Sequence, residues 1–300
     1  MRTKREDVRI GLALGGGGMR GLAHVGVLKV LDAEGIRAGY LAGTSIGAMV
    51  AAAYAAGHSA ADIEAEVLRL NQPAEAIRLL DWLPSRRGLM KGEGIVAFLD
   101  SLLGEGCTFA DLEKALAVTA TDLLAGEERV FREGSVVDAV RASIAIPGIF
   151  TPVEREGRLY VDGGLLNNVP ADVARDLGAD VVIAVDVAAS HQLTSAKSEE
   201  EHDLYHDSLL PNVAIDLWQA LAIMMDRLTQ QRLAVARPEV IVRPRIPVGA
   251  GALSGIGHAQ ALIDSGREAM EQALPSLRAA LEAAIANQQH APGDVEPNYT

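Results

Sequence analysis

The sequence predicts a three-layer α/β fold, in which helices cover both faces of a mainly parallel sheet. Short apolar runs rich in β-branched residues alternate along the chain with longer segments whose apolar residues recur at helical spacing. Strands separated by helices in this way are typical of parallel sheets. With 300 residues and 49% apolar composition, the chain can bury a large core. It contains no internal repeat and no long linker, so we expect one domain over 8–285 and a disordered polar tail at 286–300.

The strands are predicted where apolar runs are bounded by turn residues. The run DVVIAVDV at 180–187 is the strongest of them, because its centre is continuously apolar, as in a strand buried on both faces. In chain order, the predicted strands are 8–14, one that ends at 40–42, 116–121, 128–131, one that ends at 160–162, 180–187 and 239–242.

The helices are predicted where apolar residues recur every three or four positions, or where alanine dominates, as in 46–56. A break is expected at Asn71–Pro73, because proline disfavours a continuing helix. The polar run 190–208 is expected to form a surface loop. In chain order, the predicted helices are 19–34, 46–56, 62–83, 95–103, 136–143, 170–177, 213–236 and 259–285.

Charge and cysteine content narrow the classes of function. The formal net charge of −13 argues against nucleic acid as a partner and against tight docking on an anionic membrane. The single cysteine, Cys107, excludes an internal disulfide and a cysteine metal cluster, and it is expected as a small packed side chain. The most apolar window, 41–56, is shorter than the ~20 residues of a membrane span. The basic start MRTKRED lacks the apolar core of a signal peptide, so we expect a cytoplasmic protein.

Four glycines at 15–18 follow the first predicted strand, and they suggest either a phosphate site or an oxyanion site. Gly16, Gly18 and Gly21 match the spacing of a dinucleotide-binding loop. That interpretation needs an acidic residue at the end of the second strand, where this chain has Leu41-Ala42-Gly43. The Gly-Lys-Ser/Thr ending of a phosphate-binding P-loop is also missing. These two absences argue against a phosphate site and leave an oxyanion site as the favoured interpretation of the glycines.

A candidate nucleophile stands where the acidic residue would be. Gly43-Thr44-Ser45-Ile46-Gly47 lies between a predicted strand and a predicted helix, which is the context of a nucleophile elbow. The alternative is a serine that only caps the helix. Attack by Ser45 on an ester would need backbone N–H donors for the oxyanion, and Gly16, Gly17 and Gly18 offer them without side chains in the way. Arg20 either anchors this loop and adds positive charge or is an ordinary arginine on the helix surface.

Ser45 also needs a proton acceptor, for which the sequence offers two candidates. His258, in Gly255-Ile256-Gly257-His258, is the one histidine that lies late in the chain in a predicted loop. The better candidate is Asp162, which ends a predicted strand at the sharp turn Gly163-Gly164. A carboxylate is a weak base for an alcohol unless burial raises its pKa. The competing interpretation is that Asp162 and Gly163 form an ordinary turn.

Four stretches in order, GLALGGGGMRGLAHVGVLKVL, AGTSIGAMVAAAYAAG, RASIAIPGIFTPV and YVDGGLLNNVP, resemble the bacterial branch of the patatin-like phospholipases, which is related to the catalytic domain of neuropathy target esterase. The resemblance extends over about residues 8–285. It implies the patatin fold and a Ser–Asp dyad without histidine, with Ser45 as nucleophile and Asp162 as base. The loop from Gly16 to Gly21 then becomes the oxyanion hole.

The resemblance also assigns residues without a chemical role. Ser143 to Pro147 would shape the site, and Asn167 and Pro170 match the stretch after the dyad aspartate. Residues 60–105 and 189–212 follow no family motif and are candidates for a lid. Several large apolar side chains are candidates for contact with an acyl chain, with core packing as the alternative: Trp82, Phe150, Trp218, Met224 and Met225.

We therefore expect a serine hydrolase of lipid acyl esters that needs neither a metal nor another cofactor. By analogy, the substrate would be a phospholipid or a lysophospholipid, with transient contact to a membrane surface left open. Two other functions stay open: a regulatory protein that uses the fold as a binding module, and an acyltransferase that passes the acyl group to an alcohol. Neither the oligomeric state nor the head group can be read from the residues.

Overall fold

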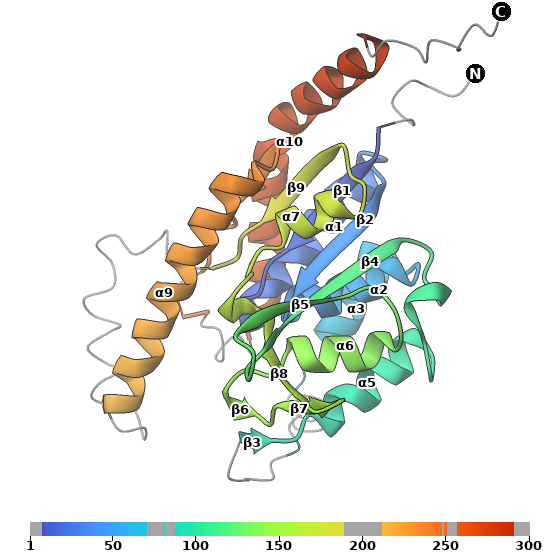
Figure 1. Cartoon of the computed structure of the whole chain (residues 1–300). Helices are drawn as coiled ribbons and strands as arrows, with labels where there is room; N and C mark the ends of the chain where they lie inside the picture. The colour runs from blue at the N-terminus through green and yellow to red at the C-terminus, as the bar shows by residue number, and fades with distance from the viewer. Residues whose placement is uncertain are drawn as a thin grey trace, which may run out of the picture.

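The protein folds around a central sheet with helices on both faces, which confirms the predicted α/β class (Figure 1). The structure is a computed structural model, and it describes residues 8–70, 72, 81, 88–188, 212–247, 249–250 and 257–290.

Its strands are β1 (Ile10–Leu14), β2 (Ala38–Thr44), β3 (Gly88–Met90), β4 (Ala115–Asp122), β5 (Glu127–Phe131), β6 (Gly148–Phe150), β7 (Val153–Arg155), β8 (Arg158–Asp162), β9 (Val181–Val185) and β10 (Val240–Val242). Its α-helices are α1 (Ala23–Ala33), α2 (Ile46–Ala55), α3 (Ala60–Leu70), α5 (Glu93–Leu103), α6 (Val136–Ser143), α7 (Ala171–Asp176), α9 (Asn212–Ala236) and α10 (Ala259–His290). Its short 3-10 helices are η1 (Gly18–Leu22), η2 (Phe109–Asp111) and η3 (Gly163–Leu165).

The main sheet has eight strands, in the order β10–β9–β1–β2–β4–β8–β7, with β5 also paired to β4. The strands from β10 to β4 run parallel, whereas β5, β8 and β7 join antiparallel. A separate pair of parallel strands, β3 and β6, completes the described sheets. Because β1 and β2 are parallel neighbours, the loops that follow them emerge at the same edge of the sheet, where α/β proteins place their sites.

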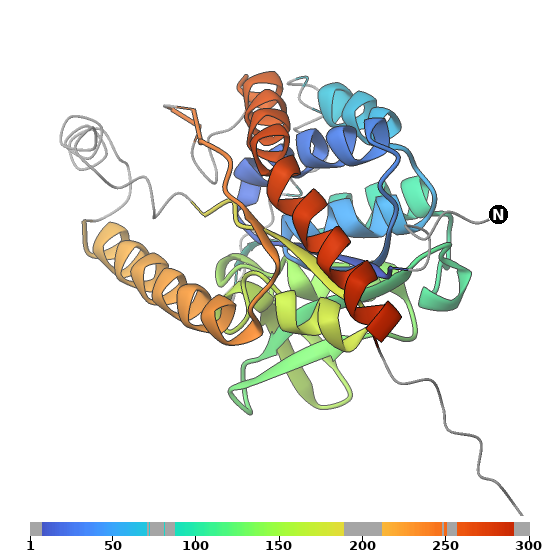
Figure 2. The ribbon, with the colours of Figure 1, turned by 90° about the horizontal axis from the view of Figure 1, so that it is seen from above.

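Both faces of the sheet are buried. Along β1, Leu12 and Leu14 face the larger core, which α1, α2 and α10 complete, whereas Ala13 between them faces the smaller core under α7. This alternation follows from the two-residue period of a strand, and it explains why the strand sequences are apolar throughout. Figure 2 shows α1, α2 and α10 on one side of the sheet and α7 on the other.

Helices α1 and α10 cross at close range because both have glycine at the crossing. A Cβ atom placed on Gly26 would lie 1.9 Å from the carbonyl oxygen of Ile263, and one on Gly266 would lie 1.8 Å from that of Ala23. No side chain fits at either distance. The last helix is therefore packed directly onto the helix that follows the glycine-rich loop.

The structure departs from the sequence expectations at several places. The expected disordered tail at 286–300 begins too early, because α10 continues to His290; of that tail, residues 291–300 lie outside the described residues. The short strands β3, β6 and β7 were not expected, since three residues give too weak a pattern. The expected loop at 190–208 and most of 71–87, with Trp82, also lie outside the described residues.

The structure describes most of the first candidate lid segment, 60–105, and little of the second, 189–212. Residues 189–211 of the second segment are outside the described part of the chain. In the first segment, Ile63 of α3 and Leu99 of α5 are buried in the larger core. Over the described residues, every helix is too short or too polar to cross a bilayer.

Candidate active site

Ser45 occupies a strained turn between β2 and α2. Its backbone has φ 55° and ψ −127°, a left-handed region that residues with a side chain seldom adopt. The flanking glycines make this turn possible: a Cβ on Gly43 would lie 2.5 Å from the Cα of Ala48, and one on Gly47 would lie 2.1 Å from the carbonyl oxygen of Leu14. The geometry is that of a nucleophile elbow, in which strain is held by the surrounding packing.

The sheet register brings Asp162 to the same level as Ser45. Thr44, the residue before Ser45, pairs with Thr119 of β4, and Asp162 of β8 pairs with the next residue of β4, Ala120. The two functional candidates therefore lie on either side of one strand. Sequence patterns cannot reveal this proximity, because it depends on β8 joining the sheet antiparallel.

The side chains of Ser45 and Asp162 lie close enough for the Ser45 hydroxyl to favour the charged form of the carboxylate. Both are almost fully buried, with 5% and 6% of their surfaces exposed. Burial raises the pKa of Asp162 to about 6, although the Ser45 hydroxyl and the hydrogen bond from the backbone N–H of Gly164 favour the charged form. That N–H lies 2.7 Å from the carboxylate Oδ1. The carboxylate therefore has a pKa near neutrality, as a general base requires.

The turn after Asp162 is held tightly in place. A Cβ on Gly163 would lie 2.4 Å from the carbonyl oxygen of Thr119, and one on Gly164 would lie 2.9 Å from Oδ1 of Asn168. Larger residues would displace the carboxylate from Ser45. Both positions of this motif, 163 and 164, therefore require glycine because a side chain would not fit.

The glycine-rich loop after β1 is fixed through its own peptide groups. The N–H of Gly15 donates to the carbonyl oxygen of Val185 at 3.0 Å, and the N–H of Gly16 donates to that of Asn168 at 3.0 Å. The side-chain amide of Asn168 in turn donates to the carbonyl oxygen of Gly16 at 3.3 Å. His24 Nε2 lies 2.7 Å from the carbonyl oxygen of Gly15, an acceptor that requires the nitrogen to carry the proton. The amide of Gly16 is thus already engaged.

Gly17 and Gly18 remain as amide donors. Their N–H groups make no backbone hydrogen bond to other described residues. Gly18 has φ 57°, which suits glycine. A Cβ on Gly16 would lie 3.1 Å from the Cβ of Ser45, so the loop passes directly beside the candidate nucleophile.

Arg20 lies in η1, at the end of this loop. Its Nε is buried without a hydrogen-bond partner among the described residues, and burial lowers the pKa of its guanidinium. Next to it, Gly21 packs against Ile46, since a Cβ there would lie 2.2 Å from Cγ2 of that side chain. The guanidinium is therefore half-buried, which argues against an ordinary arginine on the helix surface.

The residues without an expected chemical role hold the elbow from behind. The backbone N–H of Ser45 donates to Oγ of Ser143 at 2.7 Å, and the hydroxyl of Thr44 donates to the carbonyl oxygen of Asn167 at 2.8 Å. Pro170 precedes the first residue of α7. Sequence reasoning missed Thr44, and it missed Asn168, although Asn168 stands beside Asn167 in the matched motif.

No histidine in the described part of the chain is hydrogen-bonded to Ser45 or Asp162. His258 is not hydrogen-bonded to Ser45 or Asp162, and its Nε2 lies 3.5 Å from the Cβ position of Gly249. Within the described residues, no group of three or more His, Cys, Asp or Glu side chains could hold a metal ion.

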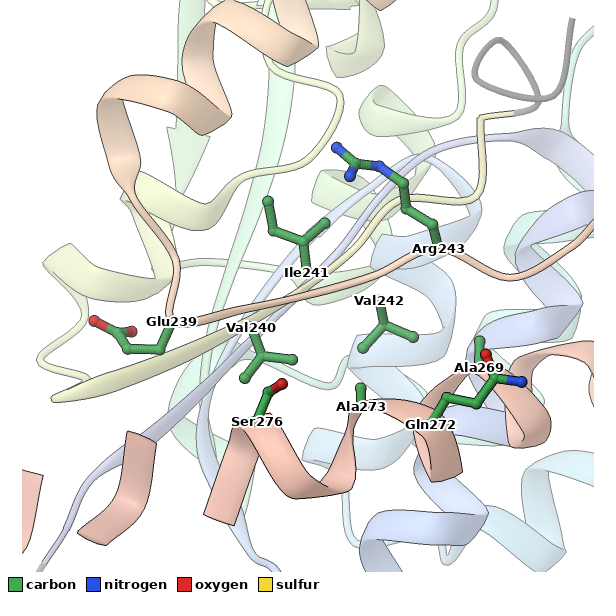
Figure 3. Close-up of a pocket in the computed structure, with 9 residues that line it drawn as sticks. All are labelled: Glu239, Val240, Ile241, Val242, Arg243, Ala269, Gln272, Ala273 and Ser276. Carbon is green, nitrogen blue, oxygen red and sulfur yellow. The ribbon is translucent and has the colours of Figure 1, made fainter. Parts of the chain in front are cut away.

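Two surface grooves lie apart from Ser45 and Asp162. The first, of about 360 Å³, runs between the edge strand β10 and α10, and Figure 3 shows its lining side chains, among them Glu239, Arg243 and Gln272. The second, of about 340 Å³, lies beside Phe131 and Tyr160. Neither contains a candidate site residue.

The chain matches the family model described as patatin-like phospholipase over residues 12–175. An uncharacterized NTE family protein of Mycobacterium tuberculosis is 36% identical over 182 residues, which cover 61% of this chain and 50% of that protein. The patatin-like phospholipase domain-containing protein 7 of Rattus norvegicus is 36% identical over 209 residues, which cover 67% of this chain and 14% of that protein. The chain thus spans half the length or less of these relatives. Among solved structures, VipD from Legionella pneumophila gives a TM-score of 0.41 at 16% identity, covering 86% of this chain and 67% of that one.

The matched region contains the glycine-rich loop, the elbow with Ser45 and the turn with Asp162. With its mostly parallel sheet flanked by helices, the chain belongs to the patatin-like phospholipase family and is related to the NTE proteins.

Proposed function

We propose that this protein is a hydrolase of lipid acyl esters, with Ser45 as nucleophile and Asp162 as general base. The observation that carries the proposal is the placement of a serine in a strained elbow beside a buried carboxylate whose pKa is raised to about 6. Membership of a phospholipase family supports a lipid ester as the substrate.

In the first half of the reaction, Asp162 accepts the hydroxyl proton while Oγ of Ser45 attacks the ester carbonyl carbon. The carbonyl electron pair moves onto its oxygen and forms a tetrahedral oxyanion. When this collapses, the bond to the alcohol breaks, and the leaving alcohol takes the proton from Asp162. The acyl group is then esterified to Ser45.

In the second half, a water molecule replaces the alcohol. Asp162 accepts a proton from the water as its oxygen attacks the acyl carbon, and a second oxyanion forms. Its collapse breaks the bond to Ser45 Oγ, which recovers the proton from Asp162. The products are the fatty acid and the free enzyme.

The oxyanion is stabilised in this proposal by the amides of Gly17 and Gly18, which are not engaged elsewhere in the loop. Gly16 contributes to the shape of the loop rather than as a donor, because its N–H is bonded to Asn168. The half-buried guanidinium of Arg20 adds positive charge, and Ser45 stands at the N-terminus of α2, where the helix dipole favours a developing anion. Loss of one oxyanion donor in such sites typically lowers the rate by about 100-fold to 1000-fold.

The test is labelling by a fluorophosphonate, which forms a covalent bond with an activated serine. We expect the wild type to be labelled, Ser45→Ala to be inert, and Asp162→Asn to be labelled about 100-fold more slowly or worse, the range of general-base catalysis. His258→Ala serves as the matched control and should label at the wild-type rate. Folded wild-type protein that takes no label, or a His258 variant that loses it, would refute the assignment.

A further inference from the structure

The first half of α9 is apolar and exposed. Between Val213 and Met225 its one ionisable residue is Asp216, and the segment contains no lysine or arginine. The exposed fraction of Leu217 is 72% and that of Met224 is 69%. Exposed large apolar side chains in this stretch are Val213, Leu217, Trp218, Ile223 and Met224.

These side chains are arranged by the helical period. Val213, Leu217 and Met224 recur along one stripe, and Met225, Thr229 and Leu233 lie on the opposite side, toward the protein. Leu233 and Thr229 are buried. A helix segment that is apolar on nearly all sides is normally covered, and a contiguous exposed apolar patch marks a binding surface. Figures 1 and 2 show α9 at the periphery of the molecule, with its first half extending beyond the sheet.

The same helix is attached to the catalytic loop. A Cβ on Gly164, two residues after Asp162, would lie 3.0 Å from Cε of Met225, so this methionine covers the loop. Further along, Arg232 donates to Glu128 at 2.8 Å, to the carbonyl oxygen of Leu166 at 3.4 Å and to Asp172. The exposed stripe and the dyad are therefore parts of one connected unit.

We propose that residues 213–225 of α9 form the surface on which the enzyme docks to a zwitterionic lipid bilayer, a proposal that rests on the proposed function. A lipid leaving such a bilayer beside Met225 arrives directly at the loop that holds Asp162. The exposed Leu, Ile, Met and Trp side chains, with Asp216 and Gln219 as the polar residues of the segment, suit the acyl and interfacial region of a bilayer.

The charge distribution selects the kind of bilayer. The segment contains no lysine or arginine that could bind an anionic head group, and the whole chain carries a formal charge of −13. The surface therefore matches phosphatidylcholine-like lipids and should lose affinity when an anionic lipid is mixed in.

The experiment measures binding of the full chain carrying Ser45→Ala, which cannot consume the vesicles, to phosphatidylcholine vesicles by co-sedimentation. In a Trp82→Phe background, emission from Trp218 reports on the surface itself, and it should shift to the blue on binding. The variant Leu217→Gln with Met224→Gln should weaken partitioning by about tenfold or more, the size expected from two lost apolar side chains. The matched control is Val235→Gln, since Val235 is 83% exposed on the same helix but outside the segment, and it should partition like the parent.

The outcomes separate this proposal from the proposed function. Equal partitioning of parent and double variant, or no partitioning of the parent, would overturn the docking surface while fluorophosphonate labelling still supports the hydrolase. Self-association that the double variant abolishes, without vesicle binding, would assign the surface to a second copy of the chain and also overturn it. Vesicle binding that depends on Leu217 and Met224 would support docking even if the protein fails to take the label.

Discussion

At the scale of single residues, Asp162 combines a catalytic demand with a cost to the fold. Its burial brings the pKa to about 6, where a carboxylate is a useful base for a serine hydroxyl. The same burial makes the charged form less stable in the folded protein than in water. Activity and stability should therefore respond to pH in opposite directions.

The activity should fall in acid. In the proposed mechanism only the charged form of Asp162 can accept the Ser45 proton, so kcat/KM for a water-soluble ester should rise with pH with a midpoint near the pKa of about 6. The measurement is a pH–rate profile on a monomeric ester, with the labelling rate as a second readout. A midpoint near 4, the ordinary value of an aspartate, would contradict the burial of the base.

The variant Asp162→Asn should lose most of its activity but be more stable at neutral pH. The folded pKa of about 6 lies above the free value of 3.8, so ionisation destabilises the fold above pH 6, less so between these values, and not at all below 3.8. That difference corresponds to at most about 3 kcal/mol at neutral pH. Denaturant unfolding at two pH values checks this, because the advantage of the variant should disappear near pH 4.

His24 should act as a positioning residue for the oxyanion loop. It is fully buried, burial lowers its pKa to about 4, and its Nε2–H therefore stays available to the carbonyl oxygen of Gly15 across the neutral range. We expect His24→Phe to slow labelling by about tenfold to 100-fold, as small displacements of catalytic groups do. His58→Phe is the matched control. His58 Nε2 lies 2.9 Å from the backbone carbonyl oxygen of Leu102, so it makes the same kind of contact, but at a place apart from the site. Equal effects of the two variants would exclude a specific role for His24.

At the scale of elements, the crossing of α1 and α10 supports the glycine-rich loop that follows β1. The loop leads through η1 directly into α1, and α10 is packed onto α1 where Gly26 and Gly266 meet the opposing backbone. A movement of α10 away from α1 would loosen the helix into which the loop leads.

The substitution Gly266→Ala should separate the two helices. Its Cβ would lie 1.8 Å from the carbonyl oxygen of Ala23, and a clash with backbone is relieved only by shifting a helix, at a cost of about 3 kcal/mol or more. Thermal unfolding should show the lower midpoint, with slower labelling at temperatures where the protein is still folded. Gly39→Ala is the control, because nothing lies within 4 Å of that Cβ position, and it should unfold near the wild-type temperature.

At the scale of the whole molecule, the sequence was most informative where local chemistry is strict. Strained glycine turns and apolar strands are encoded in short stretches, so the elbow at Ser45, the turn after Asp162 and most of the elements could be predicted. The parallel centre of the sheet follows from the alternation of strands and helices. Motif order also identified the family.

Features that depend on distant segments could not be predicted. The N–H of Gly16 is hydrogen-bonded to Asn168, and His24 is hydrogen-bonded to Gly15. Both contacts depend on how segments from different parts of the chain meet. The antiparallel entry of β8 depends on pairing rather than on composition. Helix α10 continues to His290, past the point where its residues turn polar, so the predicted end at residue 285 was too early.

Cutting the chain after residue 258 should abolish folding and labelling together. The cut removes α10, whose buried residues Leu262, Met270 and Leu277 belong to the same core as α1 and α2. A chain ending at residue 290 is the matched comparison, since it keeps the whole helix. Soluble, labelled protein from the shorter chain would show that the crossing is dispensable.

The contact between α1 and α10 also sets an order of assembly during synthesis. On the ribosome, the glycine-rich loop and Ser45 emerge well before α10, the helix that packs onto α1. A nascent chain that still lacks α10 therefore carries Ser45 before the packing between α1 and α10 can form.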